Sequence, residues 1–491
     1  MSHSVGIDVG TSSAKLVLVG EEGAIERQCQ VTYQVACPRE GWREIDPEVW
    51  WRAVCEGLRS LLAGISPDQV GSIGVTGQMH TVVLVDGCGR SVRPALMWND
   101  SRTQEDLVAA RCRLRDAGDS YNASIISVGS PAMNLAWVRE NEPDSLARTR
   151  SFLIGPDWIV FKLTGTIGTD YCEASTSSLF DMERRCWSES ARKAFGLPAE
   201  IFPEVRGSGV VAGTVKEDVA SAVGLPGLVP VIVGTGDNPA AAIPTGCLSQ
   251  GKPVLSLGTS GVLMRRRERP DYRAKGKNIL LSLDGHDCFT LVQGTVQSCG
   301  SAYSWWTRSI LGIESFSGAD AGIDPDALGG GYLLFYPHLE GEKTIYSDPT
   351  LRGAFFGLSV DVTRSQMTQA VMEGIAFGVR QLSDEMAFGL RSLDALQVVG
   401  GGSKSDVWMR ILADILDVPT LRMRGESGAG YGIALLAQAS TGESGPSALG
   451  GASLAVEKRF EPCDAAVSRY RTKYERYLRV HDAVTTLVQG E

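Results

Sequence analysis

The sequence has no apolar run long enough to cross a membrane and no leader with the features of a signal peptide. A membrane-spanning helix needs roughly 18 or more consecutive apolar residues. No run in the 491 residues approaches this length. The first ten residues, MSHSVGIDVG, lead directly into a strand-like pattern without the basic and apolar segments of a secretory leader. We therefore expect a protein that remains in the cytoplasm and has no membrane partner.

Paired cysteines and positive charge are also scarce. The eleven cysteines are scattered between Cys29 and Cys463 without a C-x-x-C pair, which argues against a disulfide framework and against a structural zinc site. The 47 Lys and Arg residues are outnumbered by 57 Asp and Glu residues, for a formal net charge of −10. Because nucleic acids and anionic membranes select basic surfaces, we expect neither as a partner.

Glycine, in contrast, is abundant. Its 57 residues gather in the clusters GTSS, GTGD, GTSG and GGGS. Such clusters either turn the chain tightly or let backbone amides approach a ligand closely. The chain is 43% hydrophobic, which is enough apolar material for two large domains.

Short apolar runs separated by turn residues predict strands throughout the chain. The runs 5–9, 15–19 and 25–31 are joined by short turns, which is typical of an antiparallel meander. Asp46 and Pro47 then supply an N-cap and a first-turn proline for an amphipathic helix. Later strand-like runs alternate with helical patterns and predict an α/β class. These runs span 70–75, 82–85, 229–233, 254–257, 289–292 and 396–399.

The chain contains a weak internal repeat with a period of about half its length. The segment IDVGTS at 7–12 is echoed by LSLGTS at 255–260, 248 residues further along. Two similar units, each opening with a strand and a Gly-Thr-Ser turn, predict domains at 1–248 and 249–491. The second copy lacks the aspartate, Asp8, of the first. A duplicated scaffold with one acidic copy suits a nucleotide cleft between two domains.

The first Gly-Thr-Ser turn, at 10–12, has two interpretations. It joins two predicted strands, so its simplest role is that of a hairpin turn. Its small residues, free amides and hydroxyls also suit a phosphate, and Asp8 beside it suits a hydrated Mg²⁺. Because the pattern occurs twice, we favour phosphate binding.

Two further motifs lie where strands are expected to end. Asp237 of GTGDN follows the run 229–233, at a place where α/β proteins usually put their ligands. The alternative is an aspartate that only caps the next helix. The segment GGGS at 400–403 lies between the run 396–399 and a helical pattern. This order is typical of an anion or nucleotide site, although three glycines alone are weak evidence.

Six segments, taken in their order along the chain, resemble the motifs of the FGGY family of carbohydrate kinases. They are IDVGTSSAK (7–15), GQMH (77–80), WNDSRT (98–103), GDNPAAA (236–242), LSLGTSG (255–261) and GGGSKSDVW (400–408). FYPHLEGEK at 335–343 resembles the family's loop around a Pro-x-Leu-x-Gly-Glu core. GQMH and WND are most similar to the xylulokinase branch of the family. The resemblance covers nearly the whole chain, from the first strand to the helix near Ile433.

The resemblance implies an actin-like ATPase fold, with two ribonuclease-H-like α/β domains and with sugar and ATP meeting in the interdomain cleft. It implies that Asp237 is the catalytic base and that Asp8 is a catalytic carboxylate that holds Mg²⁺ near the phosphates. The sugar would contact Met79, His80 and Asp237, and Asn238 is assigned to it by adjacency. The positions that match the phosphate turns and the nucleotide site are Thr11, Ser12, Gly258, Thr259, Gly300, Gly401, Gly402 and Asp406.

The implied reaction is the Mg²⁺- and ATP-dependent phosphorylation of D-xylulose to D-xylulose 5-phosphate. Thr81 follows GQMH where glycine is usual, and Pro239 follows GDN where alanine is common. Because both departures lie around the sugar, a kinase for another pentulose, a sugar acid or a polyol stays open, ribulokinase and gluconokinase included. An actin- or chaperone-like ATPase without a sugar pocket, and a pseudokinase that only binds, are alternatives of other classes. A homodimer is compatible with the family.

Overall fold

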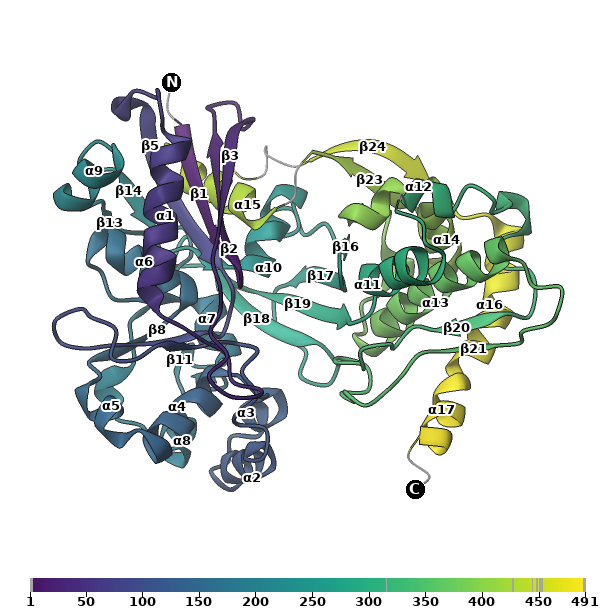
Figure 1. Ribbon diagram of the computed structural model, residues 1–491, viewed down its shortest axis with the longest axis horizontal. Coiled ribbons are helices and arrows are strands. Elements are labelled where there is room, and N and C mark those ends of the chain that lie inside the picture. The colour runs from purple at the N-terminus through teal and green to yellow at the C-terminus, as the bar shows by residue number, and fades with distance from the viewer. Residues whose placement is uncertain are drawn as a thin grey trace.

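The structure is a computed structural model that describes residues 3–314, 316–425, 428–443, 445–446, 449 and 454–488. Two α/β halves lie side by side, and each is built on a mixed sheet of seven strands (Figure 1). The first sheet lies to the left in this view and most of the C-terminal half lies to the right, except for α15, which lies beside the first sheet.

The first sheet begins with the predicted antiparallel meander and continues with parallel strands. β1 pairs antiparallel with β2 and parallel with β5, and β2 pairs antiparallel with β3. β1 and β5 are almost entirely buried, as expected for central strands that are covered on both faces. In spatial order the strands are β13 (Val211–Thr214), β14 (Pro230–Ile232), β5 (Val70–Gly77), β1 (His3–Val9), β2 (Ser13–Val19) and β3 (Ile25–Thr32), and β15 (Thr235–Gly236) pairs with β5.

The second sheet repeats this topology. β16 pairs antiparallel with β17 and parallel with β22, and β17 pairs antiparallel with β19. β16 therefore corresponds to β1, β17 to β2 and β22 to β5, so the two Gly-Thr-Ser segments open equivalent units. In spatial order the strands are β18 (Lys277–Ser282), β19 (Cys288–Val296), β17 (Gly261–Arg267), β16 (Val254–Leu257), β22 (Leu396–Val399), β23 (Thr420–Arg424) and β24 (Ala455–Phe460).

The helix predicted after Asp46 is α1 (Pro47–Leu61). Asp46 Oδ1 accepts a hydrogen bond from the Glu48 amide (3.0 Å), and Pro47 occupies the first turn. The buried face of α1, which includes Trp50 and Leu58, packs on β2 and β3. The other helices of this half are α2 (Leu107–Asp116), α3 (Ser120–Ile125), α4 (Pro131–Asn141), α5 (Pro143–Arg148), α6 (Gly155–Thr164), α7 (Tyr171–Thr176), α8 (Glu189–Ala194), α9 (Glu217–Val223) and α10 (Asp237–Ala242).

The second half carries the longest helix, α13 (Arg364–Glu385), of the described residues. Thr363 and Gln366 form a capping box at its start, because each side chain accepts a hydrogen bond from the other residue's amide (3.3 and 2.9 Å). α13 and α14 pack on each other and help to enclose the core of this half. The remaining helices are α11 (Gly300–Ser304), α12 (Phe316–Ala319), α14 (Asp406–Leu416), α15 (Ala429–Thr441), α16 (Asp464–Leu478) and α17 (Val480–Val488).

Although α15 lies between β23 and β24 of the second sheet in sequence, it packs on β1 and β5 of the first sheet (Figure 1). Two glycines permit this close approach: a Cβ on Gly6 would overlap the Gly430 carbonyl, and a Cβ on Gly74 would overlap the Ile433 carbonyl. Side chains of both halves therefore share one apolar cluster around α15. The predicted boundary between 248 and 249 separates the two sheets. It does not separate two independent hydrophobic cores, because α15 of the C-terminal half packs on the first sheet. It stays a prediction.

Short elements complete the fold. The predicted run 82–85 is β6 (Val82–Val85), which pairs antiparallel with β8 and β7 in a four-stranded sheet. The other short strands are β4 (Glu44–Ile45), β7 (Ala95–Leu96), β8 (Ser151–Ile154), β9 (Thr169–Asp170), β10 (Phe180–Asp181), β11 (Cys186–Trp187), β12 (Val205–Arg206), β20 (Leu334–Tyr336) and β21 (Ala354–Phe356).

Neither a membrane span nor a disulfide is found in the described part of the chain. None of its helices combines the length and the apolar character that crossing a membrane requires. All eleven cysteines fall within the described ranges, and each is free. Packing of the buried apolar clusters under each sheet is therefore the main source of stability.

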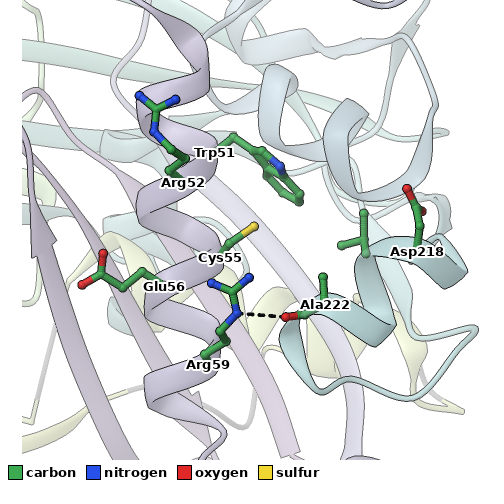
Figure 2. Close-up of a pocket in the computed structure, with 8 residues that line it drawn as sticks. Trp51, Arg52, Cys55, Glu56, Arg59, Asp218 and Ala222 are labelled. Carbon is green, nitrogen blue, oxygen red and sulfur yellow. Dashed lines mark hydrogen bonds between the residues drawn. The ribbon is translucent and has the colours of Figure 1, made fainter.

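A surface recess lies between α1 and α9 (Figure 2). Trp51, Cys55 and Arg59 line it from α1, and Asp218 and Ala222 line it from α9. Arg59 Nε donates a hydrogen bond to the Ala222 carbonyl oxygen (2.9 Å), which ties the two helices together. None of the predicted site residues lines this recess, so it is not the candidate active site.

Candidate active site

Asp8 and Asp237 lie at the same end of the first sheet, on opposite sides of β5. Asp8 of β1 stands opposite Thr76, and Thr235 of β15 stands opposite Thr76 on the other side. Thr76 Oγ1 also donates to the Thr235 carbonyl oxygen (2.7 Å), and Asp237 directly follows β15 and begins α10. The predicted position of Asp237 beyond a strand end is therefore correct, although the short strand β15 lies between β14 and the aspartate.

The two carboxylates share a poorly solvated space, which changes their protonation. Burial raises the pKa of Asp8 to about 6, and the opposing effect of Lys15 on β2 is smaller. Burial, followed by the negative charge of Asp8, raises the pKa of Asp237 to about 7. Asp237 Oδ1 accepts a hydrogen bond from the Asn238 amide (2.7 Å), whereas no described residue donates one to the Asp8 carboxylate. Asp237 is thus poised to exchange a proton near neutral pH.

The first Gly-Thr-Ser turn is held by the carbonyl oxygen of Gly10, which accepts from the Tyr33 hydroxyl (2.6 Å) and from Gln78 Nε2 (3.3 Å). Ser12 is exposed at the tip of the turn. The amides of Thr11 and Ser12 donate to no other group in the described part of the chain. Such a fixed turn with unused amides suits an anion such as phosphate.

The second turn has the same form in the other half. The Gly258 carbonyl oxygen accepts from the Gly300 amide (3.0 Å), and the Thr259 carbonyl oxygen accepts from the Ser301 amide (2.9 Å). A Cβ on Gly300 would overlap the Gly258 carbonyl, so the start of α11 approaches the turn more closely than a side chain permits. The structure therefore brings the predicted Gly258, Thr259 and Gly300 together.

The three glycines after β22 join this group. A Cβ on Gly400 would contact the backbone of Leu257 and Gly258 (2.7 and 3.3 Å), and one on Gly402 would contact Leu257 and Trp408 (2.9 and 3.1 Å). Gly401, in contrast, has open space around its Cβ position. The segment lies between β22 and α14, as predicted; 401–404 form a 3-10 turn, and α14 starts at Asp406. Ser405 forms its N-cap, so the glycines do not form the helix N-terminus.

The carboxylate of Asp406 is engaged in ion pairs. Its Oδ1 accepts from Arg422 Nη2 (2.6 Å), and its Oδ2 pairs with Lys458. Arg422 Nε donates in addition to the Ser403 carbonyl oxygen (2.6 Å). Asp406 thus acts on the glycine segment through Arg422, and its direct contact with a nucleotide stays a prediction.

Met79 and His80 lie at the other side of Asp237. The side chain of Met79 is buried against Gly236, where a Cβ would approach Met79 Cγ to 2.6 Å. His80 has a left-handed backbone (φ 69°), which is uncommon outside glycine and indicates a constrained position. Its amide donates to Glu173 Oε2 (3.3 Å). Met79 therefore packs against the residue that precedes Asp237, and His80 is half-buried; their contact with a sugar stays a prediction.

The hydroxyl of Thr81 accepts a hydrogen bond within the protein. Its Oγ1 accepts a hydrogen bond from the Trp98 amide (3.2 Å), and the Trp98 indole Nε1 donates to Thr11 Oγ1 (3.1 Å). Thr81 is completely buried, whereas Trp98 is 40% exposed. The residue that replaces the usual glycine therefore helps to position an aromatic ring beside the first Gly-Thr-Ser turn.

Two residues that contact His80, Glu173 and Lys277, lie outside every sequence motif and were not predicted. Glu173 of α7 is fully buried behind His80, and burial, reinforced by nearby carboxylates, raises its pKa well above the usual range. Lys277, the first residue of β18, places its Nζ 3.4 Å from His80 Nε2. Both come from segments outside the six motifs, and only the packing of α7 against β18 brings them to the site.

The residues at Asp8 fit a magnesium ion that is bound together with phosphates. The described residues contain no group of three or more His, Cys, Asp or Glu side chains that could hold a metal alone. Mg²⁺ commonly uses only one or two carboxylates and takes its other ligands from water and phosphate oxygens. The Asp8 carboxylate, with no protein hydrogen bond, matches this requirement.

Two topologically equivalent sheets, with a Gly-Thr turn from each and an acidic pair on one side, define a two-domain phosphotransferase of the actin-like ATPase fold. Two family models match the chain: the N-terminal domain of the FGGY family of carbohydrate kinases over residues 3–244 and the C-terminal domain over residues 254–441. The chain belongs to the FGGY family of carbohydrate kinases.

Known proteins of this family are similar over their full length. The xylulose kinase of Lactococcus lactis subsp. lactis is 30% identical over 98% of this chain and 97% of its own. The xylulose kinase of Bacillus subtilis is 30% identical over 90% of this chain and 89% of its own. A solved structure of a "xyloylose kinase" from Brucella ovis is 29% identical, covers 99% of this chain and 100% of its own, and superposes with a TM-score of 0.87. These comparisons confirm the predicted family and fold class.

Proposed function

We propose that this carbohydrate kinase transfers the γ-phosphoryl group of ATP to the 5-hydroxyl of D-xylulose. The observation that carries the proposal is Asp237, a carboxyl with a pKa raised to about 7 that lies beside Asp8. A base of this kind is suited to accept a hydroxyl proton near neutral pH. The xylulose kinases among the relatives support the choice of acceptor.

In the proposed reaction the acceptor oxygen bonds to the γ-phosphorus, the bond to the bridging oxygen of ADP breaks, and the proton moves to Asp237. Phosphoryl transfer asks the protein mainly for alignment and for stabilisation of charge. The free amides of the Thr11 and Thr259 turns would donate to phosphate oxygens from the two halves. Mg²⁺ held at Asp8 would neutralise charge on the phosphates.

The acceptor would lie between Asp237 and His80. His80 Nδ1 is buried without a hydrogen-bond partner in the described part of the chain, so a sugar hydroxyl would satisfy it. Trp98 offers an exposed ring at the first turn, and Asn238 follows the base directly. The adenosine end of ATP would lie by the open space at Gly401.

The test is a coupled ADP-release assay over a panel of acceptors at fixed Mg·ATP. The panel contains D-xylulose, L-xylulose, D- and L-ribulose, D-gluconate, glycerol and common polyols. We expect the highest kcat/KM among the neutral sugars for D-xylulose. A neutral sugar that exceeds it tenfold would replace D-xylulose in the proposal.

The same assay distinguishes the proposed sugar kinase from the alternative of a chaperone-like ATPase. Such a protein would release ADP at a rate that no sugar changes. A kinase with Asp237 as base would show a low basal rate and strong stimulation by its acceptor, because water is a poorly aligned competitor. Sugar-independent turnover would therefore overturn the proposed function as a whole.

We also propose that the chain works in the cytoplasm, where a reducing environment keeps thiols free. All eleven cysteines are unpaired, and several of them are exposed. Fractionation of native cells with an antibody to the chain would test this location.

A further inference from the structure

The two ring nitrogens of His80 lie in different surroundings. Its Nε2 is 3.4 Å from the Nζ atom of Lys277, within hydrogen-bond distance. Its Nδ1 is buried and has no hydrogen-bond partner in the described part of the chain. A neutral histidine carries a proton on one ring nitrogen only, and the other nitrogen accepts. The partner of Nε2 therefore decides what Nδ1 offers to a ligand.

The charge states of the two residues set the direction of this hydrogen bond. Burial, aided by the charge of Lys277, lowers the pKa of His80 well below its ordinary value, so its ring is neutral. Burial lowers the pKa of Lys277 to about 8, so its amine is still protonated at pH 7. An ammonium group has three donors and no acceptor. Lys277 therefore donates to Nε2, and the ring proton of His80 lies on Nδ1.

Lys277 is held in place by contacts between the two halves. It is the first residue of β18, the edge strand of the second sheet, which packs on α7 of the first half (Figure 1). The Leu280 amide of β18 donates to Ser175 Oγ of α7 (3.0 Å). The Tyr121 hydroxyl donates to the Asn278 carbonyl oxygen (3.3 Å). These bonds fix the start of β18 against the first half, so Lys277 has a defined position.

The backbone of His80 is supported by the same helix. Glu173 Oε2 of α7 accepts a hydrogen bond from the His80 amide (3.3 Å), and His80 has a left-handed backbone (φ 69°). One helix thus holds the histidine backbone and also the strand that carries the lysine. The orientation of the ring and the partner of its Nε2 are therefore fixed by the folded protein before a ligand arrives.

We propose that Lys277 is a positioning residue that fixes the Nδ1–H tautomer of His80, so that Nδ1 donates a hydrogen bond to an oxygen of the acceptor sugar. This inference rests on the proposed kinase function and adds a residue of the C-terminal half to acceptor recognition. The opposite tautomer would present a lone pair, which only a hydroxyl donor satisfies. The fixed donor instead suits an oxygen that only accepts, such as the carbonyl oxygen of a ketose, and also the lone pairs of a hydroxyl.

The first experiment determines the tautomer by NMR and needs no turnover. The chain has five histidines, so isotopic labelling of histidine alone gives few ring signals, and the signal that is lost in His80→Asn belongs to His80. We expect wild-type His80 to be protonated on Nδ1 at pH 7. Lys277→Met should shift the population towards Nε2–H, whereas Lys277→Arg keeps a cationic donor and should keep Nδ1–H.

The wild-type signal decides the tautomer even if Lys277→Met does not fold. A wild-type His80 that is protonated on Nε2 would overturn the inference. An unchanged tautomer in a folded Lys277→Met would overturn it as well, because the lysine would then not be the group that fixes the proton.

The second experiment compares two amide variants of His80 in the kinase assay with D-xylulose. The amide nitrogen of an asparagine can take the place of Nδ1, and that of a glutamine can take the place of Nε2. Only His80→Asn therefore keeps a donor towards the sugar. We expect the KM of His80→Gln to exceed that of His80→Asn by about 5- to 10-fold, with a smaller difference in kcat. Equal KM values, or the reverse order, would contradict a donor at Nδ1.

The third experiment combines the substitutions and separates positioning from a structural role. Lys277→Met should raise the KM for D-xylulose about 5- to 10-fold in the wild-type background. In the His80→Asn background it should change the KM less than about twofold, because an amide has no tautomer to fix. Lys193→Met, an exposed lysine of α8 that pairs with Glu189, is the control and should leave the KM unchanged. Equal effects of Lys277→Met in both backgrounds would overturn the positioning role.

The NMR and kinetic results distinguish this inference from the proposed function. A lysine-dependent Nδ1–H tautomer without any sugar-stimulated ADP release would keep the tautomer assignment and overturn the kinase function. An Nε2–H tautomer in a chain that phosphorylates D-xylulose would overturn the positioning role and leave the kinase function intact.

Discussion

The two halves of this kinase use one strand-turn-strand unit for different chemistry. β1 and β2 enclose the turn after Asp8, and β16 and β17 enclose the equivalent turn with Ser256 at the position of Asp8. Both turns are fixed through a glycine carbonyl and leave threonine amides unused. The backbone device for binding an anion is thus duplicated. The carboxylate beside the turn, Asp8, occurs in the first copy only.

The electrostatic contrast extends beyond the turns. Asp8, Asp237 and Glu173 of the first half are carboxyls with raised pKa values, because they are buried near one another. The second half contributes Lys277 and Lys343, whose pKa values are lowered by burial. This contrast can be tested by substitutions that remove a charged group from one half or introduce one into the other.

The largest effect is expected from removing the base of the first half. Asp237→Asn should lower kcat by about 10²–10⁴, because the hydroxyl proton loses its acceptor. The amide can keep the side-chain geometry, so the affinity for Mg·ATP in calorimetry should stay close to wild type. Turnover within threefold of wild type would assign the base role to another residue.

An exchange of the two turn residues tests the contrast directly. Asp8→Ser should lower kcat by roughly 10–10³ and raise the Mg²⁺ concentration for half-maximal activity, because it removes a ligand of the ion. Ser256→Asp should weaken ATP binding about tenfold, since it adds a negative charge near phosphate oxygens in the half that lacks the compensating cation. Mg²⁺ titrations of both variants check these outcomes. An unchanged Mg²⁺ requirement in Asp8→Ser would leave Asp8 as a turn residue.

The second turn depends on contact with the start of α11, which the first turn does not have. Gly300→Ala should raise the KM for ATP about tenfold and destabilise the fold by ~1–3 kcal/mol, because the new methyl group overlaps the Gly258 carbonyl. Gly401→Ala is the matched control for stability, since nothing lies within 4 Å of its Cβ position. Thermal unfolding and ATP titrations should separate the two variants. Equal melting temperatures would show that α11 adjusts freely.

The buried acid of the first half should have a cost in stability that depends on pH. Because the pKa of Asp237 is raised when folded, its ionised form opposes folding above about pH 7, and this penalty disappears as pH falls below its unfolded pKa of about 4. Asp237→Asn should therefore be more stable than wild type by ~1–4 kcal/mol at pH 8. The difference should shrink steadily towards pH 4. Thermal unfolding without nucleotide at both pH values measures it, and a pH-independent difference would contradict the assignment.

The smallest effect is expected at Thr81, which links the sugar side to the first turn. Thr81→Val removes the acceptor of the Trp98 amide and should raise the sugar KM about three- to tenfold, in line with the loss of roughly 1 kcal/mol for one hydrogen bond. Thr81→Ser keeps the hydroxyl and should stay within twofold. If both variants behave alike, the methyl group of Thr81 would matter and its hydroxyl would not.

Much of the framework follows from local sequence. The meander of β1, β2 and β3, the capped helix α1 and the strands at 254–257 and 396–399 all occur where alternation, caps and turns predict them. The repeated Gly-Thr-Ser segment also indicated the equivalence of the two sheets. These features depend on neighbours along the chain, so a single sequence is sufficient to predict them.

The start of α14 and the domain boundary were less predictable. The glycines at 400–402 lie between a strand and a helix, as predicted, but the pattern did not reveal the 3-10 turn and the Ser405 cap that precede the helix. Nothing local signals that α15 would cross to the first sheet. That contact exists because Gly6 and Gly74, far away in sequence, leave room for the helix backbone.

The sequence by itself determined which residues are predicted to carry the phosphoryl chemistry, because Asp8, Asp237 and the two Gly-Thr turns each stand in a recognisable motif. Only the tertiary structure decided how strong these acids are, because a pKa depends on burial and on charges from distant segments. It alone brought Glu173 and Lys277 into contact with His80. Local spacing contains no signal for such groups, since they meet through the packing of two sheets whose strands lie far apart in the chain.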